Sequence, residues 1–161
     1  MNQHLERLKT LAPVIQTPAL ELILRCEKQL KRTLLVVRTW SSYSEQLELY
    51  KKGRRVVGSE WVVVDPSQIV TKAFPGTSAH NVVTPAGMPA AMALDVVPLK
   101  EDGTPDWAAP LAFWNDLYEM AWKVGLDPLG DAIGAHFAYD KAHFEEPAWK
   151  LKLESWKEYR L

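Results

Sequence analysis

The chain has 161 residues, of which 47 % are hydrophobic and 24 % are charged, and its formal net charge is −1 at pH 7. This length fits one domain around a single core, and the composition is that of an ordinary globular protein. The balanced charge argues against a nucleic-acid binder that works through bulk charge. The single cysteine, Cys26, excludes an internal disulfide, so nothing requires an oxidising compartment.

The first third of the chain predicts two helices. A short helix is expected over residues 3–11. A second helix is expected to be capped by Thr17, with Pro18 in its first turn. Apolar residues recur along it with helical spacing, at Leu20, Ile23, Leu24 and Leu30. Cys26 falls within this segment, where we interpret it as a small buried hydrophobe and not as a nucleophile.

The next segments alternate between strand and helix. The sequence TLLVVR over 33–38 predicts a buried strand, and Ser42 with Glu45 forms a capping box that opens a helix. A second strand is expected over 60–65, ended by Pro66. The proline- and glycine-bearing residues that follow, 70–81 and 82–90, predict loops.

The second half predicts a buried strand over residues 91–99 and a long helix from Trp107 to Lys123, capped by Asp106 and stopped by Gly125. A further short strand is expected within 141–149. Helices beside a small, mostly antiparallel sheet indicate the α+β class. The N-terminus lacks the apolar core of a signal peptide, and no run is long enough to span a membrane. We therefore expect synthesis in the cytoplasm and no integral membrane association.

One residue of the apolar strand AMALDVVPL is anomalous, because Asp95 places a carboxylate in its middle. An ionised carboxylate is costly to bury unless it is paired, hydrogen-bonded or bound to a metal. Two histidines and one carboxylate form a standard set of three ligands for a catalytic zinc, with water in the fourth position. His80, from a loop, and His143, from another strand, could complete such a set.

Two further residues fit a metal-assisted hydrolysis. Asp140 lies three residues before His143, where a turn of chain can hold a carboxylate over a metal-bound water without using it as a ligand. Such a carboxylate can take the proton of the water and pass it to a leaving amine. Arg38, at the end of a buried strand, can stabilise an oxyanion, although a salt bridge at the strand end is the simpler interpretation.

Four segments in this order, RTWSSYSEQLELYKKGR, VTKAFPGTSAHN, AMALDVVPL and DKAHFEEPAW, resemble the LAS group of zinc peptidases. That group includes phage L-alanyl-D-glutamate endolysins, D-Ala-D-Ala dipeptidases and D,D-carboxypeptidases. The resemblance covers about residues 34–148, preceded by helices in 1–32 and followed by a docking tail, 149–161. It implies a single peptidase domain, 1–161, with the hedgehog/D-Ala-D-Ala peptidase type of α+β fold.

The resemblance also implies roles for individual residues: zinc ligands at His80, Asp95 and His143, general base and acid at Asp140, transition-state stabilisation at Arg38, and substrate contacts at Ser78 and Gln46. The implied cofactor is one Zn²⁺ per chain, and the implied partner is the stem peptide of peptidoglycan. We expect a monomeric endopeptidase of phage lysis type that cuts L-Ala–D-Glu and leaves the cell through a membrane lesion. The alternatives are a D,D-carboxypeptidase or dipeptidase on the same scaffold, and an inactive homologue that binds cell-wall peptides or serves as a structural phage component.

The sequence departs from the family in the stretch between His80 and Asp95, which is longer here and has Ala91 where the family often has glycine. The additional residues, 82–90, are rich in proline and small side chains and suit a surface loop inserted between two ligands. We expect this loop to lie beside the cleft and to influence substrate choice. If it displaced His80, His136 would be the substitute ligand.

Overall fold

The computed structural model describes residues 3–129 and 140–161. Its helices are α1 (Gln3–Leu8), α2 (Pro13–Arg25), α3 (Tyr43–Lys51), α4 (Leu111–Val124) and α6 (Trp149–Ser155). Shorter helical turns cover Cys26–Leu30, Pro66–Gln68 and Ala79–Asn81. The strands are β1 (Leu34–Arg38), β2 (Arg54–Val57), β3 (Glu60–Val63), β4 (Ala93–Pro98), β5 (Asp127–Pro128) and β6 (His143–Glu145).

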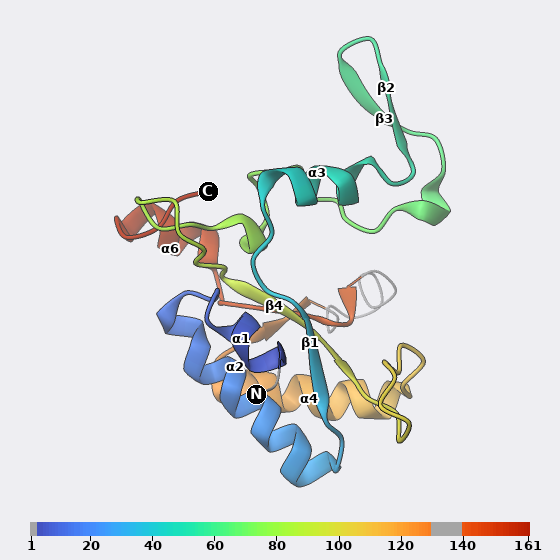
Figure 1. Ribbon diagram of the computed structural model, residues 1–161, viewed down its shortest axis with the longest axis vertical. Coiled ribbons are helices and arrows are strands. Elements are labelled where there is room, and N and C mark those ends of the chain that lie inside the picture. Colours follow the sequence, from blue (N-terminus) through green and yellow to red (C-terminus); the bar gives the residue numbers. More distant parts are fainter. Residues whose placement is uncertain (1–2, 130–139) are drawn as a thin grey trace.

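A four-stranded sheet lies at the centre of the molecule (Figure 1). Its strand order is β1-β4-β6-β5, and every neighbouring pair is antiparallel. The longest strand, β4, therefore lies between β1 and β6. This small antiparallel sheet with flanking helices, in a single domain, confirms the predicted α+β class.

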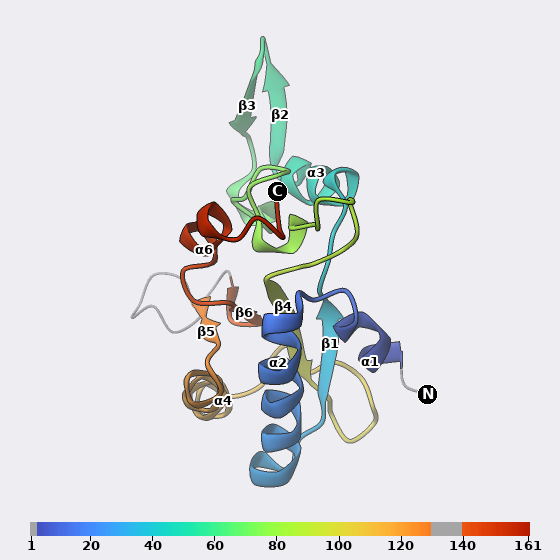
Figure 2. The same cartoon turned by 90° about the vertical axis from the view of Figure 1, so that its left-hand side faces the viewer.

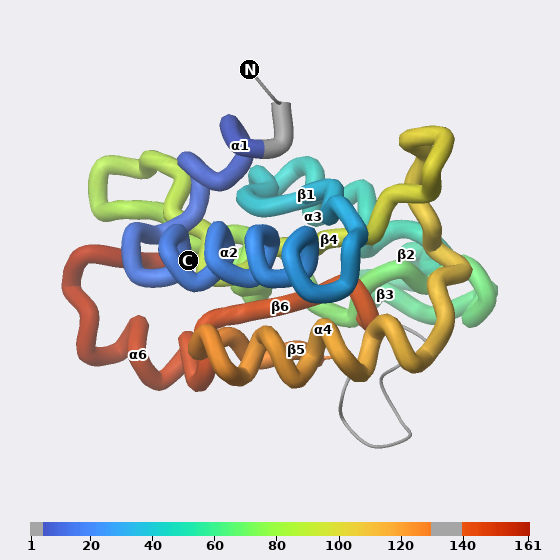
Figure 3. The backbone as a smooth tube through the Cα atoms, turned by 90° about the horizontal axis from the view of Figure 1, so that it is seen from below, coloured from blue at the N-terminus to red at the C-terminus, as the bar shows by residue number. Residues whose placement is uncertain are grey.

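Helices α2 and α4 contact each other on one side of the sheet (Figure 3). The core between helices and sheet is closely packed and includes fully buried side chains of both helices and of β4, among them Ile15, Leu22, Trp114, Leu117 and Leu94. Because side chains alternate across a strand, Leu94 and Val96 of β4 face this core while Asp95 faces the opposite side. The anomalous carboxylate thus belongs to the face that α2 and α4 leave uncovered.

The predicted start of the second helix was wrong. Helix α2 begins at Pro13, so Thr17 and Pro18 lie inside it. Proline is well tolerated at the first helical position because its missing N–H would have no partner there, and Pro13 takes that place. The buried residues of the helix are Ile15, Ala19 and Leu22, whereas Leu20 and Leu24 are exposed. Contact with α4, and not the helical spacing of apolar residues alone, therefore determines which face of α2 is buried.

Two other expected elements have different surroundings from those predicted. The strand at 60–65 exists as β3, but it pairs only with β2 in a hairpin that projects from the body of the molecule (Figure 2). Valines of this hairpin are correspondingly exposed. The long helix begins at Leu111 and not at Trp107, with Pro110 at its N-cap, and Asp106 forms an ion pair with Arg32 at 2.8 Å instead of capping it. Its predicted stop, Gly125, is confirmed and adopts a left-handed conformation.

The capping box at the start of α3 is confirmed. The Ser42 hydroxyl accepts a hydrogen bond from the Glu45 backbone N–H at 3.2 Å, and the Glu45 carboxylate accepts one from the Ser42 backbone N–H at 2.8 Å. Such reciprocal bonds satisfy two backbone donors at the start of a helix. The box fixes the direction in which the chain leaves β1, and it therefore sets where α3 lies relative to the sheet.

The Cys26 thiol is buried, and it donates a hydrogen bond to the Arg32 carbonyl oxygen at 3.3 Å. Burial raises the pKa of Cys26 to about 12, with a smaller opposing effect from Arg32. We expect native protein at pH 8 to react with a thiol reagent only as fast as it unfolds, and unfolded protein to react at once. Because the unfolded thiol ionises at lower pH, the contribution of Cys26 to stability should decline between about pH 9 and 12. Rapid labelling of the native protein would contradict this assignment.

Among the described residues, no helix combines the length and the apolar character that crossing a membrane requires.

Candidate metal centre

Three adjacent strands place Arg38, Asp95 and His143 in one row across the sheet. Asp95 pairs with Arg38 of β1 on one side and with His143 of β6 on the other. Directly opposed residues of an antiparallel pair project from the same face of the sheet. A shift in register between Val36 and Arg38 brings the arginine into this row. The sheet register therefore assembles one cation, one carboxylate and one imidazole from segments distant in the sequence.

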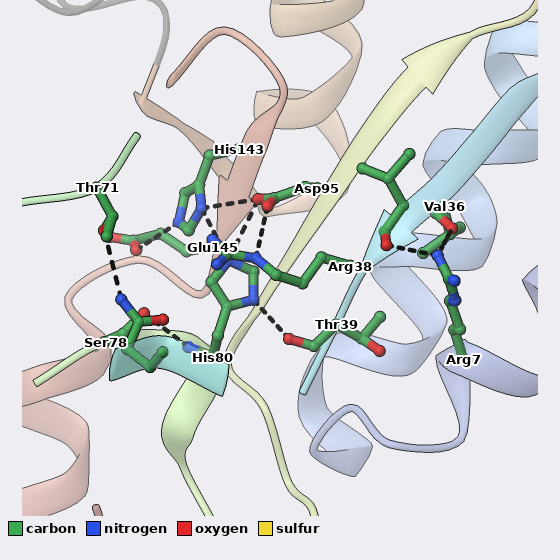
Figure 4. A network of polar contacts seen from close by, with 12 residues as sticks. Arg7, Val36, Arg38, Thr39, Thr71, Ser78, His80, Asp95, His143 and Glu145 are labelled. Carbon is green, nitrogen blue, oxygen red and sulfur yellow. Dashed lines mark hydrogen bonds and ion pairs between the residues drawn. The ribbon is translucent and has the colours of Figure 1, made fainter. Parts of the chain in front are cut away.

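His80 reaches the same point from a loop. It lies in the helical turn Ala79–Asn81. Ser78 caps this turn, since its hydroxyl accepts a hydrogen bond from the His80 backbone N–H at 3.3 Å. The His80 side chain is fully buried and points at Asp95 and His143 (Figure 4). One donor atom from each of His80, Asp95 and His143 lies within 4.8 Å of the others, so the three could hold a metal ion.

The separations of these atoms fit a zinc site. The Asp95 Oδ1 atom lies 3.0 Å from His143 Nδ1 and 3.2 Å from His80 Nε2, and the two nitrogens are 3.2 Å apart. In a tetrahedral zinc site with bonds of about 2.0–2.2 Å, donor atoms are roughly 3.3–3.5 Å from one another. The observed triangle would need to expand by only a few tenths of an ångström. Two imidazoles and a carboxylate, with a fourth position open, are also a donor set typical of catalytic zinc.

Neighbouring acceptors determine which nitrogen of each ring faces the centre. The Thr39 backbone carbonyl can only accept, so His80 Nδ1 must donate to it, which leaves Nε2 directed at Asp95. On the other ring, Nε2 of His143 lies 3.0 Å from a carboxylate oxygen of Glu145, which leaves Nδ1 directed at Asp95. Hydrogen bonds of this kind orient metal-ligating histidines.

The protonation states of the three residues suit the binding of a cation. Burial would raise the pKa of Asp95, but His80, Arg38 and the hydrogen bonds of both rings together hold it well below the ordinary range. Burial would lower the pKa of His143, but hydrogen bonds to Asp95 and Glu145 outweigh it and raise that pKa to about 10. The pKa of His80 is lowered, chiefly by burial. A protonated His143 and Arg38 thus compensate the negative charge of Asp95.

Arg38 forms the expected salt bridge at the end of its strand, and it also borders the cavity in which an oxyanion could bind. Its Nε donates to Asp95 Oδ2 at 2.8 Å, which is the predicted salt bridge at the end of the strand. It also lines a cavity of about 400 Å³ above the His–Asp–His cluster. Because the bond to Asp95 uses Nε, the terminal nitrogens of the guanidinium remain for a partner in the cavity.

The cavity brings most of the predicted site residues together. Its lining includes His80, His143, Arg38, Ser78 and Asp140. Burial raises the pKa of Asp140, an effect that His143 partly offsets. Within residues 3–129 and 140–161, no hydrogen bond involves the Asp140 carboxylate, although the charge of His143 acts on it. One wall of the cavity is formed by the extended segment 69–73, and another by Ala148 and the start of α6.

Gln46, which was expected near the cleft, lies directly behind one wall of the cavity. Its side chain is fully buried, and its amide donates to the Ala73 carbonyl at 2.9 Å, which belongs to the 69–73 wall. The Gln46 amide therefore supports the 69–73 wall from the side away from the cavity, and Gln46 is not among the residues that line the cavity. The reason is geometric: in helix α3, which the capping box fixes, position 46 faces the body of the protein.

The inserted segment 82–90 forms a tight turn beside the C-terminal tail and not beside the cavity. Val83 exchanges two backbone hydrogen bonds of 2.8 Å with Arg160, and Thr84 N–H donates to the Met88 carbonyl at 2.9 Å. None of its residues lines the cavity. His80 is not displaced, which removes the reason for a substitute, and His136 lies outside the described residues.

No family model and no curated protein matches the chain. Solved structures share its fold. One is the LdcB LD-carboxypeptidase, whose structure reveals the molecular basis of peptidoglycan recognition, with a TM-score of 0.53 and 16 % sequence identity. The likeness covers 90 % of this chain and 64 % of the carboxypeptidase chain, so this chain spans less than two thirds of that protein. Fold and site together define an α+β protein of this architecture with a His–Asp–His candidate metal centre.

Proposed function

We propose that this protein is a zinc-dependent peptidase that hydrolyses an amide bond in the stem peptide of peptidoglycan, with L-Ala–D-Glu as the bond cut. The observation that carries the proposal is the convergence of His80, Asp95 and His143 at the floor of a cavity that also contains Asp140 and Arg38. A fold shared with a peptidoglycan LD-carboxypeptidase supports the substrate class. The four motifs that resemble zinc peptidases support the same chemistry.

Zinc at such a site would polarise the scissile carbonyl and lower the pKa of a bound water toward about 7. His80, Asp95 and His143 would hold it. Asp140 accepts the proton of the attacking water and later delivers it to the leaving amine. Arg38 donates from its terminal nitrogens to the oxygen that gains negative charge. The Ser78 hydroxyl, at the cavity wall, contacts the bound peptide.

A carboxypeptidase or dipeptidase on the same scaffold is the second candidate. It is favoured by one observation, since one of the solved proteins that share this fold is a carboxypeptidase. The two candidates differ in the products they release from peptidoglycan. An L-Ala–D-Glu endopeptidase creates a new N-terminal D-Glu, whereas a D,D-carboxypeptidase releases free D-Ala. Mass spectrometry of the digest distinguishes them.

Zinc quantification paired with peptidoglycan digestion tests the proposal. We expect one zinc per chain in the purified protein, soluble peptide fragments from digested peptidoglycan, and loss of those fragments after a chelator. Added zinc should restore them. Stoichiometric zinc with no change in the peptidoglycan would contradict the proposed reaction, and absence of zinc together with intact peptide binding by His143→Ala would favour an inactive homologue.

We further propose that the protein is made in the cytoplasm and reaches the wall through a membrane lesion at lysis. The resemblance of its motifs to those of phage endolysins supports this route. Fractionation of expressing cells with and without a co-expressed membrane-lesion protein tests it. Wall damage from outside the membrane in cells that lack the lesion protein would contradict it.

A further inference from the structure

Glu145 is the described carboxylate of the site that none of the roles above uses. It lies two residues after His143 on β6, so the two side chains project from the same face of the strand. Its carboxylate oxygen Oε2 lies 3.0 Å from His143 Nε2. Its side chain is 16 % exposed and borders the cavity. Figure 4 shows Glu145 beside the His143 ring, on the side away from Asp95.

The two histidines of the cluster face its centre through different nitrogens. His80 presents Nε2, since its Nδ1 donates to the Thr39 carbonyl. His143 presents Nδ1, since its Nε2 is taken by Glu145. A backbone carbonyl cannot be removed by substitution, but the second acceptor is a side chain. The choice of nitrogen on His143 therefore depends on one replaceable residue.

A charged acceptor on the outer nitrogen has two effects on a metal ligand. It keeps the proton on that nitrogen, so the lone pair of the other nitrogen is the one available to the metal, and it makes that lone pair more basic. It also fixes the orientation of the ring plane. Both effects require contact with His143 and neither requires contact with the peptide substrate.

We propose that Glu145 is the positioning residue of the metal centre: it fixes His143 as a ligand through Nδ1 and strengthens its bond to zinc. This inference rests on the metal site of the proposed function but not on peptide hydrolysis. It assigns Glu145 a role distinct from that of Asp140. With its carboxylate bonded to His143, Glu145 is a poor candidate for the general base.

The test compares Glu145→Gln and Glu145→Ala with the wild type by zinc competition against a chromophoric chelator. Loss of such an outer partner typically weakens metal affinity by about 10–100-fold, and we expect a loss in that range for Glu145→Ala. Glu145→Gln, which keeps an acceptor without the charge, should lose less. Glu146→Gln is the matched control, because the neighbouring carboxylate bonds to Lys152 and not to His143. It should bind zinc as the wild type does.

Nitrogen-15 NMR of labelled histidine provides a readout that a merely structural role would not move. In the zinc-bound wild type we expect a protonated Nε2 and a metal-bound Nδ1 on His143, and the opposite arrangement on His80. In Glu145→Ala the His143 signals should lose the single Nδ1-bound pattern while those of His80 keep theirs. Circular dichroism confirms that each variant is folded.

Three results would overturn the inference. Unchanged affinity and an unchanged His143 pattern in Glu145→Ala would show that Glu145 does not position the ring. Zinc loss as complete as in His143→Ala would make Glu145 a ligand itself. A wild type that binds no zinc would remove the metal site altogether. The first two results do not test whether the protein hydrolyses a peptide. Failure of this inference and failure of the proposed function are therefore distinguishable.

Discussion

Asp140→Asn is expected to retain one zinc per chain and to lose peptidoglycan hydrolysis by about 100-fold or more, the usual contribution of a general base. The retained metal follows from the geometry, because Asp140 belongs to the cavity lining and not to the triangle formed by His80, Asp95 and His143. The lost activity follows from chemistry, because an amide cannot take the proton of the attacking water. Initial rates of fragment release, at matched zinc content, measure the effect.

The protonation of Asp140 should also make the rate depend on pH. Among the protein's own groups, burial raises the pKa of Asp140 more than His143 lowers it, and a zinc ion held by His143 would act in the same direction as His143. A base with a raised pKa is closer to the range in which it can both accept and return a proton near neutral pH. We expect the rate of the wild type to fall at acidic pH as Asp140 becomes protonated, and the residual rate of Asp140→Asn to lack that limb.

Asp116→Asn is the matched control for this experiment. Asp116 is an exposed aspartate of α4, on the opposite side of the sheet from the cavity, and the same substitution there removes one charge without touching the site. It should hydrolyse peptidoglycan at the wild-type rate. If Asp140→Asn did so as well, the proton of the attacking water would have to be taken by another group, and Asp140 would lose its role as the general base.

The sequence predicted the part of the site that strands encode locally. Asp95 is recognisable because a carboxylate within an apolar strand needs a partner, and Arg38 and His143 end or begin strands of their own. Their alignment in one row could not be predicted, since it depends on the register shift between Val36 and Arg38. Register is set by pairing between segments distant in sequence, which local periodicity does not contain.

Other features that the sequence left open also depend on contacts between distant segments. Whether Gln46 faces the cavity or the protein interior depends on how α3 is rotated against the 69–73 wall, and Leu20 and Leu24 are exposed because α4 selects another stripe of α2. The role of Glu145 had a usable signal, because residues i and i+2 of a strand share a face. The spacing of His143 and Glu145 in the segment HFE therefore indicates a carboxylate beside the second histidine.

His143→Ala and His80→Ala are each expected to lose zinc, by more than the roughly 10–100-fold that an outer partner contributes, because each removes one of three protein ligands. The two variants should differ in stability. His80 is fully buried and its ring donates to the Thr39 carbonyl, so its removal leaves a buried acceptor without its partner. His143→Ala deprives Asp95 of one hydrogen bond but leaves it the ion pair with Arg38.

Asp95→Asn tests whether metal binding requires the negative charge of Asp95 or only the size of its side chain. It keeps the size of the side chain but removes the negative charge that Arg38, at 2.8 Å, and the protonated His143 compensate. We expect it to lose zinc as the histidine variants do, because the remaining set has no anionic ligand and retains a neighbouring guanidinium that repels a divalent cation. Metal analysis after dialysis, with urea unfolding to confirm folding, measures both quantities. His136→Ala is the control among the histidines and should keep its zinc. If His136→Ala lost its zinc and His80→Ala kept it, His136 and not His80 would be the metal ligand.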